Sequence, residues 1–203
     1  MPSTCMNNNP DMDTLFEGVF QKLMAPDFGK NLGGELPLFI QPIPNSGQTE
    51  LNIQAHRLVS RLTKKGKTAM TIDLYVLCTS LLDEEGVLQT ILEEEQSLEK
   101  EDIVSTIDSI LDIKSVVIRR ISDMINEQNP EFVFITGVGR VYPFIRSHGI
   151  LNNIDELAKR NNLVLFFPGE YNNLQLSLFG TICDENYYRG HNLEEIKIPI
   201  VTI

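Results

Sequence analysis

The richest mixture of reactive side chains in this sequence lies between residues 137 and 148, directly after an apolar run of strand length. Its members are two glycines, two arginines, a tyrosine, a serine and a histidine: Gly137, Gly139, Arg140, Tyr142, Arg146, Ser147 and His148. Arginines bind phosphate and carboxylate groups through paired N–H donors, and histidine exchanges protons near neutral pH. The stretch therefore predicts an anion-binding site or acid–base chemistry. The favoured alternative is structural, with the arginines holding neighbouring loops together.

A second polar stretch follows the next apolar run, which covers residues 163–167. It reads Pro-Gly-Glu-Tyr, so Glu170 and Tyr171 are expected in a turn directly after that strand. If the strands at 131–136 and 163–167 are parallel neighbours, their carboxyl ends meet at one edge of the sheet. The sequence then predicts a single polar edge formed by Arg140, Arg146, His148, Glu170 and Tyr171. An ion pair between Arg146 and Glu170 is the structural alternative to ligand binding.

The common catalytic templates are not met. Gly47 follows an expected strand, but the turn contains no lysine for the β and γ phosphates, so the Walker A pattern fails. The Gly-x-Gly at residues 137–139 does not extend to a dinucleotide fingerprint, because Tyr142 occupies the place of the third glycine. The three histidines have no partners at metal-ligand spacing. We therefore expect no catalytic residues, no cofactor and no metal.

Apolar periodicity predicts helices that alternate with short apolar strands. Strands are expected at residues 36–43, 68–73, 131–136 and 163–167, and the first helices at 12–23 and 51–62. This alternation predicts an α/β fold with a mostly parallel, Rossmann-like or P-loop-like sheet flanked by helices and without a functional Walker A loop. Residues 1–12 are expected to be disordered and residues 13–203 to form one domain. Asp73 is expected to cap the helix after its strand, with a role in the site as the alternative.

Residues 84–128 read as helical throughout, which is more helix than one crossover between parallel strands requires. We expect a helical insertion packed beside the sheet. Residues 83–102 contain nine carboxylates against Lys100, and this excess of eight accounts for most of the net charge of −11. The acidic run is either a solvated helix face, which is the commoner case, or a docking surface for a basic partner.

The composition narrows the class of protein. No apolar run reaches the roughly 20 residues that a membrane helix needs, and the N-terminus lacks the features of a signal peptide. We therefore expect a cytoplasmic protein without membrane contact. The acidic balance disfavours direct nucleic-acid binding, and the basic turn at residues 64–67 leaves it as a third hypothesis. The cysteines are odd in number and widely spaced, and Cys78 is expected to be a small core residue.

Several motifs in order resemble one known family. They lie at residues 72–75, 92–95, 134–148, 151–153, 166–171, 178–180 and 186–189. Together they resemble the BrxB family of bacteriophage-exclusion (BREX) defence systems over most of the chain from about residue 12. The strand at 36–43 and its turn are less typical of the family. Three further polar residues of the matched motifs join the candidate contact residues: Asn152, Tyr187 and Arg189.

The resemblance implies a cytosolic component of a system that protects host DNA by methylation and blocks phage replication. It implies partners such as a PglZ-type phosphatase-like protein, a BrxC-type ATPase and a PglX-type methyltransferase, but it supplies no catalytic mechanism. The leading hypothesis is a non-catalytic adaptor that uses the acidic helical segment and the edge at 137–148 as contact surfaces. The alternative is a nucleotide- or phosphate-responsive regulator with Arg140 and Arg146 as anion ligands. Homo-oligomerisation is left open.

Overall fold

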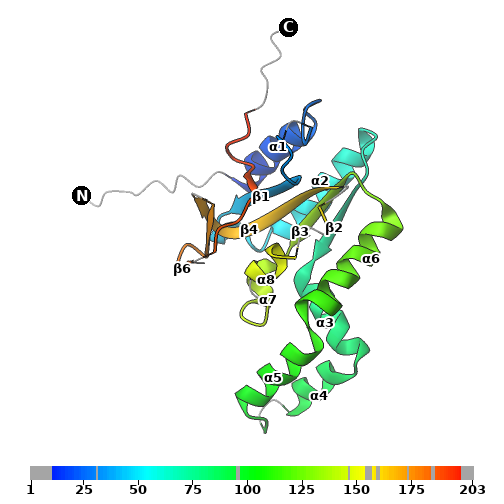
Figure 1. Cartoon of the computed structure of the whole chain (residues 1–203), viewed down its shortest axis with the longest axis vertical. Helices are drawn as coiled ribbons and strands as arrows, with labels where there is room; N and C mark the ends of the chain where they lie inside the picture. The colour runs from blue at the N-terminus through cyan, green and yellow to red at the C-terminus, as the bar shows by residue number, and fades with distance from the viewer. Residues whose placement is uncertain are drawn as a thin grey trace, which may run out of the picture.

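The computed structural model of the protein describes residues 11–30, 32–94, 97–145, 147–153, 157–158, 161–172, 174–183 and 186–197. Its centre is a parallel sheet with the strand order β2-β3-β4-β1-β7 (Figure 1). These strands are β1 (Leu38–Ile43), β2 (Ala69–Asp73), β3 (Phe132–Thr136), β4 (Asn162–Asn172) and β7 (His191–Asn192). The expected α/β class with a mostly parallel sheet is confirmed, and β3 and β4 are parallel neighbours.

The central strands are continuous apolar runs because helices cover both of their faces. Every residue of β3 is buried, and its side chains alternate between two cores. Phe132 and Phe134 face one core, whereas Val133 and Ile135 face the other. This period of two is what a strand imposes on its side chains.

The first face of the sheet is covered by α1 (Met12–Leu23) and α2 (Leu51–Lys64). The core beneath them is rich in aromatic rings, and Phe166 of β4 stacks on Phe16 of α1 with ring centroids 5.1 Å apart. A short 3-10 turn, η1 (Asn45–Gly47), connects β1 to the start of α2. Both helices lie where the apolar spacing predicts them.

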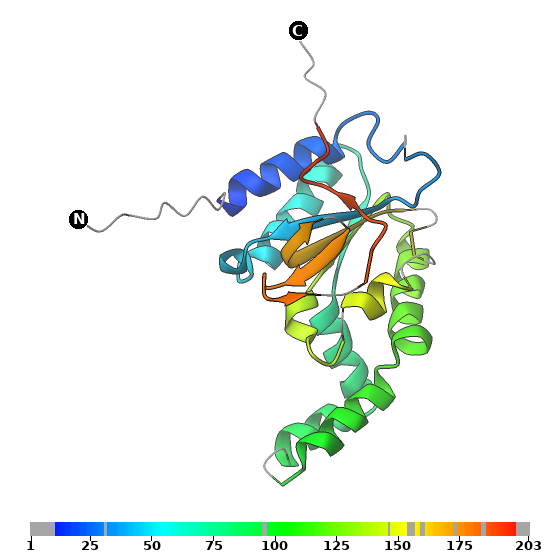
Figure 2. The same cartoon turned by 60° about the vertical axis from the view of Figure 1, so that its left-hand side comes forward.

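The opposite face is covered by α3 (Leu74–Glu84), η2 (Ile113–Ile118), α6 (Arg119–Gln128), α7 (Val138–Val141) and α8 (Ser147–Leu151) (Figure 2). Between α3 and η2 the chain forms α4 (Val87–Glu94) and α5 (Lys100–Ile110). These two helices extend away from the sheet as an arm (Figures 1 and 2), and none of the side chains of α4 is buried. The described residues between 84 and 128 are thus predominantly helical, as the sequence predicts, but α4 and α5 do not lie beside the sheet.

A bidentate ion pair joins the two ends of this excursion. Arg120, at the start of α6, donates to both carboxylate oxygens of Glu84, at the end of α3, over 3.0 and 2.6 Å. The paired hydrogen bonds from the guanidinium hold the pKa of the Glu84 carboxyl below its ordinary value. The pair therefore connects α3 and α6 at the base of the arm.

One sequence expectation about the sheet is wrong. The stretch at residues 168–171 is not a turn after a strand, because β4 continues through it to Asn172. The antiparallel strand β5 (Gln175–Leu178) pairs with residues 169–172 and keeps them extended, and β6 (Ile182–Cys183) pairs with β5. Gly169 allows this continuation, since its φ of +139° and its contact with the backbone of Ser177 leave no room for a side chain.

Candidate functional site

The carboxyl end of β2 delivers Asp73 to the edge of the sheet, where it also begins α3. Its Oδ1 atom accepts hydrogen bonds from the backbone N–H groups of Tyr75 and Val76 over 3.0 and 3.4 Å. The carboxylate therefore satisfies donors that an uncapped helix would leave without partners. The prediction that Asp73 caps this helix is confirmed.

The second oxygen of Asp73 gathers partners from two other elements. Its Oδ2 atom accepts a hydrogen bond of 2.6 Å from Asn52, in the first turn of α2, and an ion pair from Arg140 of α7. The guanidinium of Arg140 also lies 4.9 Å from the ring centroid of Tyr75. The end of β2, the first turn of α2 and α7 thus meet at the Asp73 carboxylate. Arg140 is therefore paired with a residue of β2.

The two glycines of the stretch at 137–148 allow close packing at this edge. Gly137 has a φ of +82°, and a Cβ atom there would lie within 3.0 Å of the backbone nitrogens of Leu74 and Tyr75. At Gly139 a Cβ would lie 2.9 Å from the ring of Phe179. The glycines therefore seat α7 between the start of α3 and the β4–β5 hairpin.

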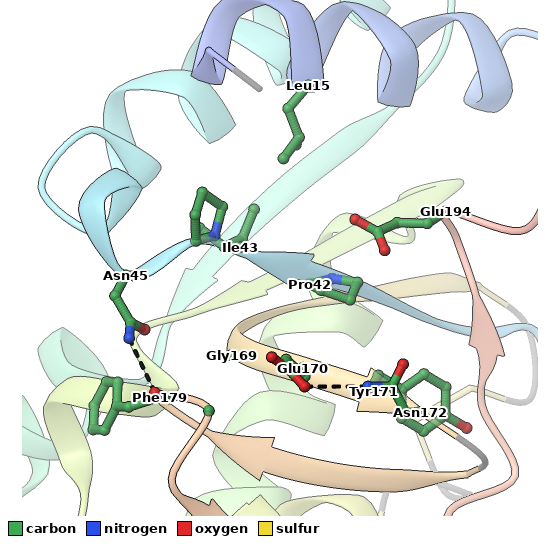
Figure 3. A pocket seen from close by; sticks show the side chains of 12 residues that line it. Leu15, Pro42, Ile43, Asn45, Gly169, Glu170, Tyr171, Asn172, Phe179 and Glu194 are labelled. Carbon is green, nitrogen blue, oxygen red and sulfur yellow. Dashed lines mark hydrogen bonds between the residues drawn. The ribbon is translucent and has the colours of Figure 1, made fainter. Parts of the chain in front are cut away.

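A pocket of about 470 Å³ lies at the carboxyl end of β1, the region where open α/β sheets place their ligands. Ile43, the last residue of β1, pairs with Pro168, so the rest of β4 extends past β1 and forms one wall. Two carboxylates and two amides from three segments line the pocket (Figure 3): Asn45, Glu170, Asn172 and Glu194. Such acceptors suit an ammonium or guanidinium group better than a phosphate.

Hydrogen bonds fix the walls of this pocket. Asn45 donates to the backbone oxygen of Phe179 over 3.0 Å, which ties the turn after β1 to the turn after β5. Lys22 of α1 donates over 2.6 and 3.3 Å to the backbone oxygens of Leu193 and Glu194 in the turn after β7. Partial burial lowers the pKa of Lys22. The segment that contributes Glu194 is therefore fastened to α1.

Tyr171 has a structural position. Its ring is buried, and its hydroxyl lies 2.7 Å and 2.8 Å from the backbone oxygens of Tyr188 and Gly190. Burial raises the pKa of this phenol, so the hydroxyl keeps its proton at neutral pH. Tyr171 therefore fastens the C-terminal segment to β4.

The remaining predicted residues are spread over this end of the molecule. Tyr142 is half-buried after α7, whereas Asn152, Tyr187 and Arg189 are exposed. Arg146 lies outside the described residues, as do the side chains of Ser147 and His148. The predicted pairing of Arg146 with Glu170 therefore stays a prediction.

The edge expected from the sequence consists of two parts. Gly137, Gly139 and Arg140 lie with Asp73, whereas Glu170 lines the pocket beside β1 and accepts a 3.2 Å hydrogen bond from Asn172.

Some residues of the site carry only a weak sequence signal. Asn45 lies two residues after the end of β1, and a position so close to the carboxyl end of a strand could have marked it. Asn52 lies in a helix and Glu194 in a loop without periodicity, so only the fold brings them to the edge.

A metal site or a reactive thiol elsewhere would depend on the titratable and metal-ligating side chains described outside this edge. No group of three or more His, Cys, Asp or Glu side chains among the described residues is arranged to hold a metal ion. Cys78 is buried in the core, as expected, and burial raises the pKa of its thiol to about 12. Its sulfur is therefore protonated at neutral pH and serves as an apolar core atom.

The fold and this edge define a parallel α/β protein with helices on both faces of the sheet and polar groups at the carboxyl ends of its strands. A family model described as "BREX protein BrxB" matches residues 70–193. The chain belongs to the BrxB family of the BREX systems.

Two relatives extend the similarity to nearly the whole chain. The BREX protein BrxB of Bacillus cereus (strain H3081.97) is 36% identical over 183 residues, which cover 86% of this chain and 93% of the relative. The BREX protein BrxB of Escherichia coli O9:H4 (strain HS) is 25% identical over 199 residues, which cover 96% of this chain and 98% of the relative. No solved structure is significantly similar to the chain.

Family membership gives the protein a role in phage defence and implies association with other BREX components. Across the part of the chain that the structure describes, no helix combines the length and the apolar character needed to cross a membrane.

Proposed function

We propose that the protein is a non-catalytic adaptor of a BREX complex, which contacts a PglZ-type protein and other BREX proteins through the α4–α5 arm and the edge at 137–148. The observation that carries the proposal is the arm itself. The two helices extend from the sheet, α4 has no buried side chain, and Ile107 is the buried side chain of α5. Such a segment is better suited to contacts with another protein.

The arm has the surface character of a contact region. Leu92 and Val104 are exposed by 62% and 41%, and Leu88, Ile91 and Ile103 are only partly buried. Large exposed apolar side chains surrounded by charges are typical of protein–protein interfaces. In this arm they occur among acidic residues, which would select a basic partner.

The edge beside Asp73 presents a second contact region. Three large hydrophobic side chains within three residues of Asn52 or Asp73 in the sequence are exposed: Ile53, Tyr75 and Val76. Arg140 lies over the Tyr75 ring, and arginine and tyrosine are both enriched at the centres of interfaces. The ion pair with Asp73 holds this arginine in one orientation, so less entropy is lost when a partner binds.

The alternative function, a nucleotide- or phosphate-responsive regulator, receives no specific support at this edge. Arg140 is paired with Asp73, so an anion would have to displace that carboxylate. The pocket at the end of β1 is lined by Glu170 and Glu194, which would repel phosphate. A rise in Tm with millimolar ATP, GTP or a dinucleotide would favour the regulator, because a ligand that binds only the folded state stabilises it.

The adaptor proposal is tested by co-purification. The full chain is tagged and expressed with the complete BREX operon, and the proteins retained after washing are identified by mass spectrometry. We expect the PglZ-type protein and further BREX proteins to be retained, whereas the same tag on an unrelated acidic protein should retain none. Recovery of the tagged chain without any BREX protein would refute the adaptor function.

A further inference from the structure

A groove of about 620 Å³ lies at the base of the arm. One wall is α5, which contributes Val104 and Asp108, and Leu111 follows directly after the helix. Val104 and Asp108 are four residues apart and therefore lie on one face of α5. The other wall consists of Pro143, Phe144, Gly149 and Asn153. Residues of the arm and of the segment that begins at Pro143 therefore line the same groove.

The floor of the groove is held by close packing. Gly149 of α8 contacts Ile113 at the start of η2 so tightly that a Cβ at Gly149 would overlap the Ile113 side chain. Asp112 caps η2, since its Oδ1 atom accepts hydrogen bonds from the backbone N–H and the hydroxyl of Ser115 over 2.7 and 2.6 Å. The contact between Gly149 and Ile113 therefore joins the two walls of the groove.

The groove combines an apolar lining with strongly acidic surroundings. Phe144 and Val104 are exposed by 40% and 41%, and Pro143 and Ile113 line the space between them. The charged side chains that line the groove are Asp108, Asp112 and Lys114. The arm adds to the negative charge, because residues 83–112 contain eleven carboxylates and one lysine. An occupant must therefore bring apolar side chains to the groove and positive charge to its rim.

We propose that this groove and the acidic arm bind a basic amphipathic helix of another BREX protein, an inference that rests on the proposed adaptor function. An α-helix fits because it can lie beside α5 and present apolar side chains at i, i+4 and i+7 toward Val104, Ile113 and Phe144 in the groove. Lysine or arginine side chains on its flanks face the carboxylates of α4 and α5. The partner helix adds a third helix to the pair that forms the arm.

A second copy of this chain is a poor occupant. Of the described helices, α2 carries several basic residues, but two of them already face α1 within the same molecule. Arg61 pairs with Glu17 over 2.6 Å, and Arg57 lies 3.8 Å from Asp13. The partner helix therefore belongs to a different protein.

The test uses the tagged full chain expressed with the complete operon. Phe144→Asp places a charge in the apolar lining, and Asp108→Lys reverses a charge on the α5 wall. We expect each substitution to reduce the recovered partner at least tenfold, and the wild-type complex to weaken as salt rises. The matched control is Leu174→Asp, at an exposed leucine on the β4–β5 hairpin with a φ of +65°, which should keep wild-type recovery. Circular dichroism melting of each variant verifies folding.

The outcomes separate the two proposals. Loss of every BREX partner from the wild-type chain refutes the adaptor function. Wild-type recovery by Phe144→Asp and Asp108→Lys leaves the adaptor intact and overturns the groove as its docking site.

Carbodiimide cross-linking of the complex gives an independent readout, because it joins a carboxylate to a lysine amine as an amide with loss of water. Cross-links from residues 83–112 to lysines of one partner helix support the proposal. Cross-links confined to other surfaces, or self-association abolished by Phe144→Asp, overturn it.

Discussion

Gly137→Ala is the substitution that tests most directly how the edge of the sheet is assembled. The glycine adopts a φ of +82°, which L-residues avoid. It also packs against the start of α3, where an added Cβ would overlap the Asp73 carboxylate and lie within 3.0 Å of the Leu74 and Tyr75 nitrogens. To admit the methyl group, α3 and α7 must separate. This movement disturbs the carboxylate that caps α3 and pairs with Arg140.

The expected loss has two parts. The left-handed conformation costs about 1–2 kcal/mol for a residue with a Cβ. Displacing the Asp73 cap costs a further 1 kcal/mol or so, and about 2 kcal/mol at most. We therefore expect Gly137→Ala to lower the free energy of unfolding by about 2–4 kcal/mol, the sum of these two terms.

Gly66→Ala is the matched control, because it separates the two parts. Gly66 lies two residues after the end of α2 and has a φ of +77°, and a Cβ there would meet no atom within 4 Å. It therefore carries the conformational cost alone, and the effect of the methyl group on the unfolded chain is the same in both variants. Urea denaturation, extrapolated to water, gives the free energy for each. Equal losses in the two variants, within about 0.5 kcal/mol, would refute the packing of Gly137 against α3.

Three further measurements address the core and the charges. Phe166→Ala should cost about 3–5 kcal/mol in urea denaturation, because the fully buried ring packs between the aromatic rings of α1 and β3. Maleimide at pH 8 should label exposed Cys183 in peptide maps and reach Cys78, whose thiol pKa is raised to about 12 by burial, only after unfolding. The stability that Glu84→Gln removes should be largest above pH 5 and should vanish as acid titrates the carboxyl, since pairing with Arg120 depresses its folded pKa. The urea midpoints of the wild-type and Glu84→Gln proteins are compared at pH 7 and at pH 3. An equal difference between the two proteins at both pH values would contradict a stabilising role of the ionised Glu84.

The sequence predicts the central strands because burial on both faces leaves a direct mark on it. β3 and the first part of β4 are continuous runs of apolar residues, which is the pattern of a strand that is buried on both faces. Their parallel pairing follows from the crossover between them. The extension of β4 was missed because Pro168 and Gly169 are turn residues by local propensity. Only the pairing with β5 keeps them extended, and this tertiary contact overrides the local preference.

The partner of Arg140 could not be predicted from its neighbours in the sequence. Asp73 lies 67 residues earlier, at the end of a different strand. The pair forms because β2 and β3 are adjacent, with Asp73 opposite Thr136 in the register. The sequence places both residues at strand ends, but it groups Arg140 with Glu170 and Tyr171 at the end of the strand at 163–167. A correct strand order would have brought them together.

The position of the groove explains why its two walls were expected as separate surfaces. α5 and the segment at 143–153 belong to different crossovers, the first between β2 and β3 and the second between β3 and β4. Right-handed crossovers from consecutive parallel strands fall on the same face of a sheet when the strands are added in one direction. In the order β2-β3-β4 both connections therefore cover the same face of the sheet. They contact each other there, since Gly149 packs on Ile113. Val104 of α5 and Phe144 remain exposed where the two connections meet.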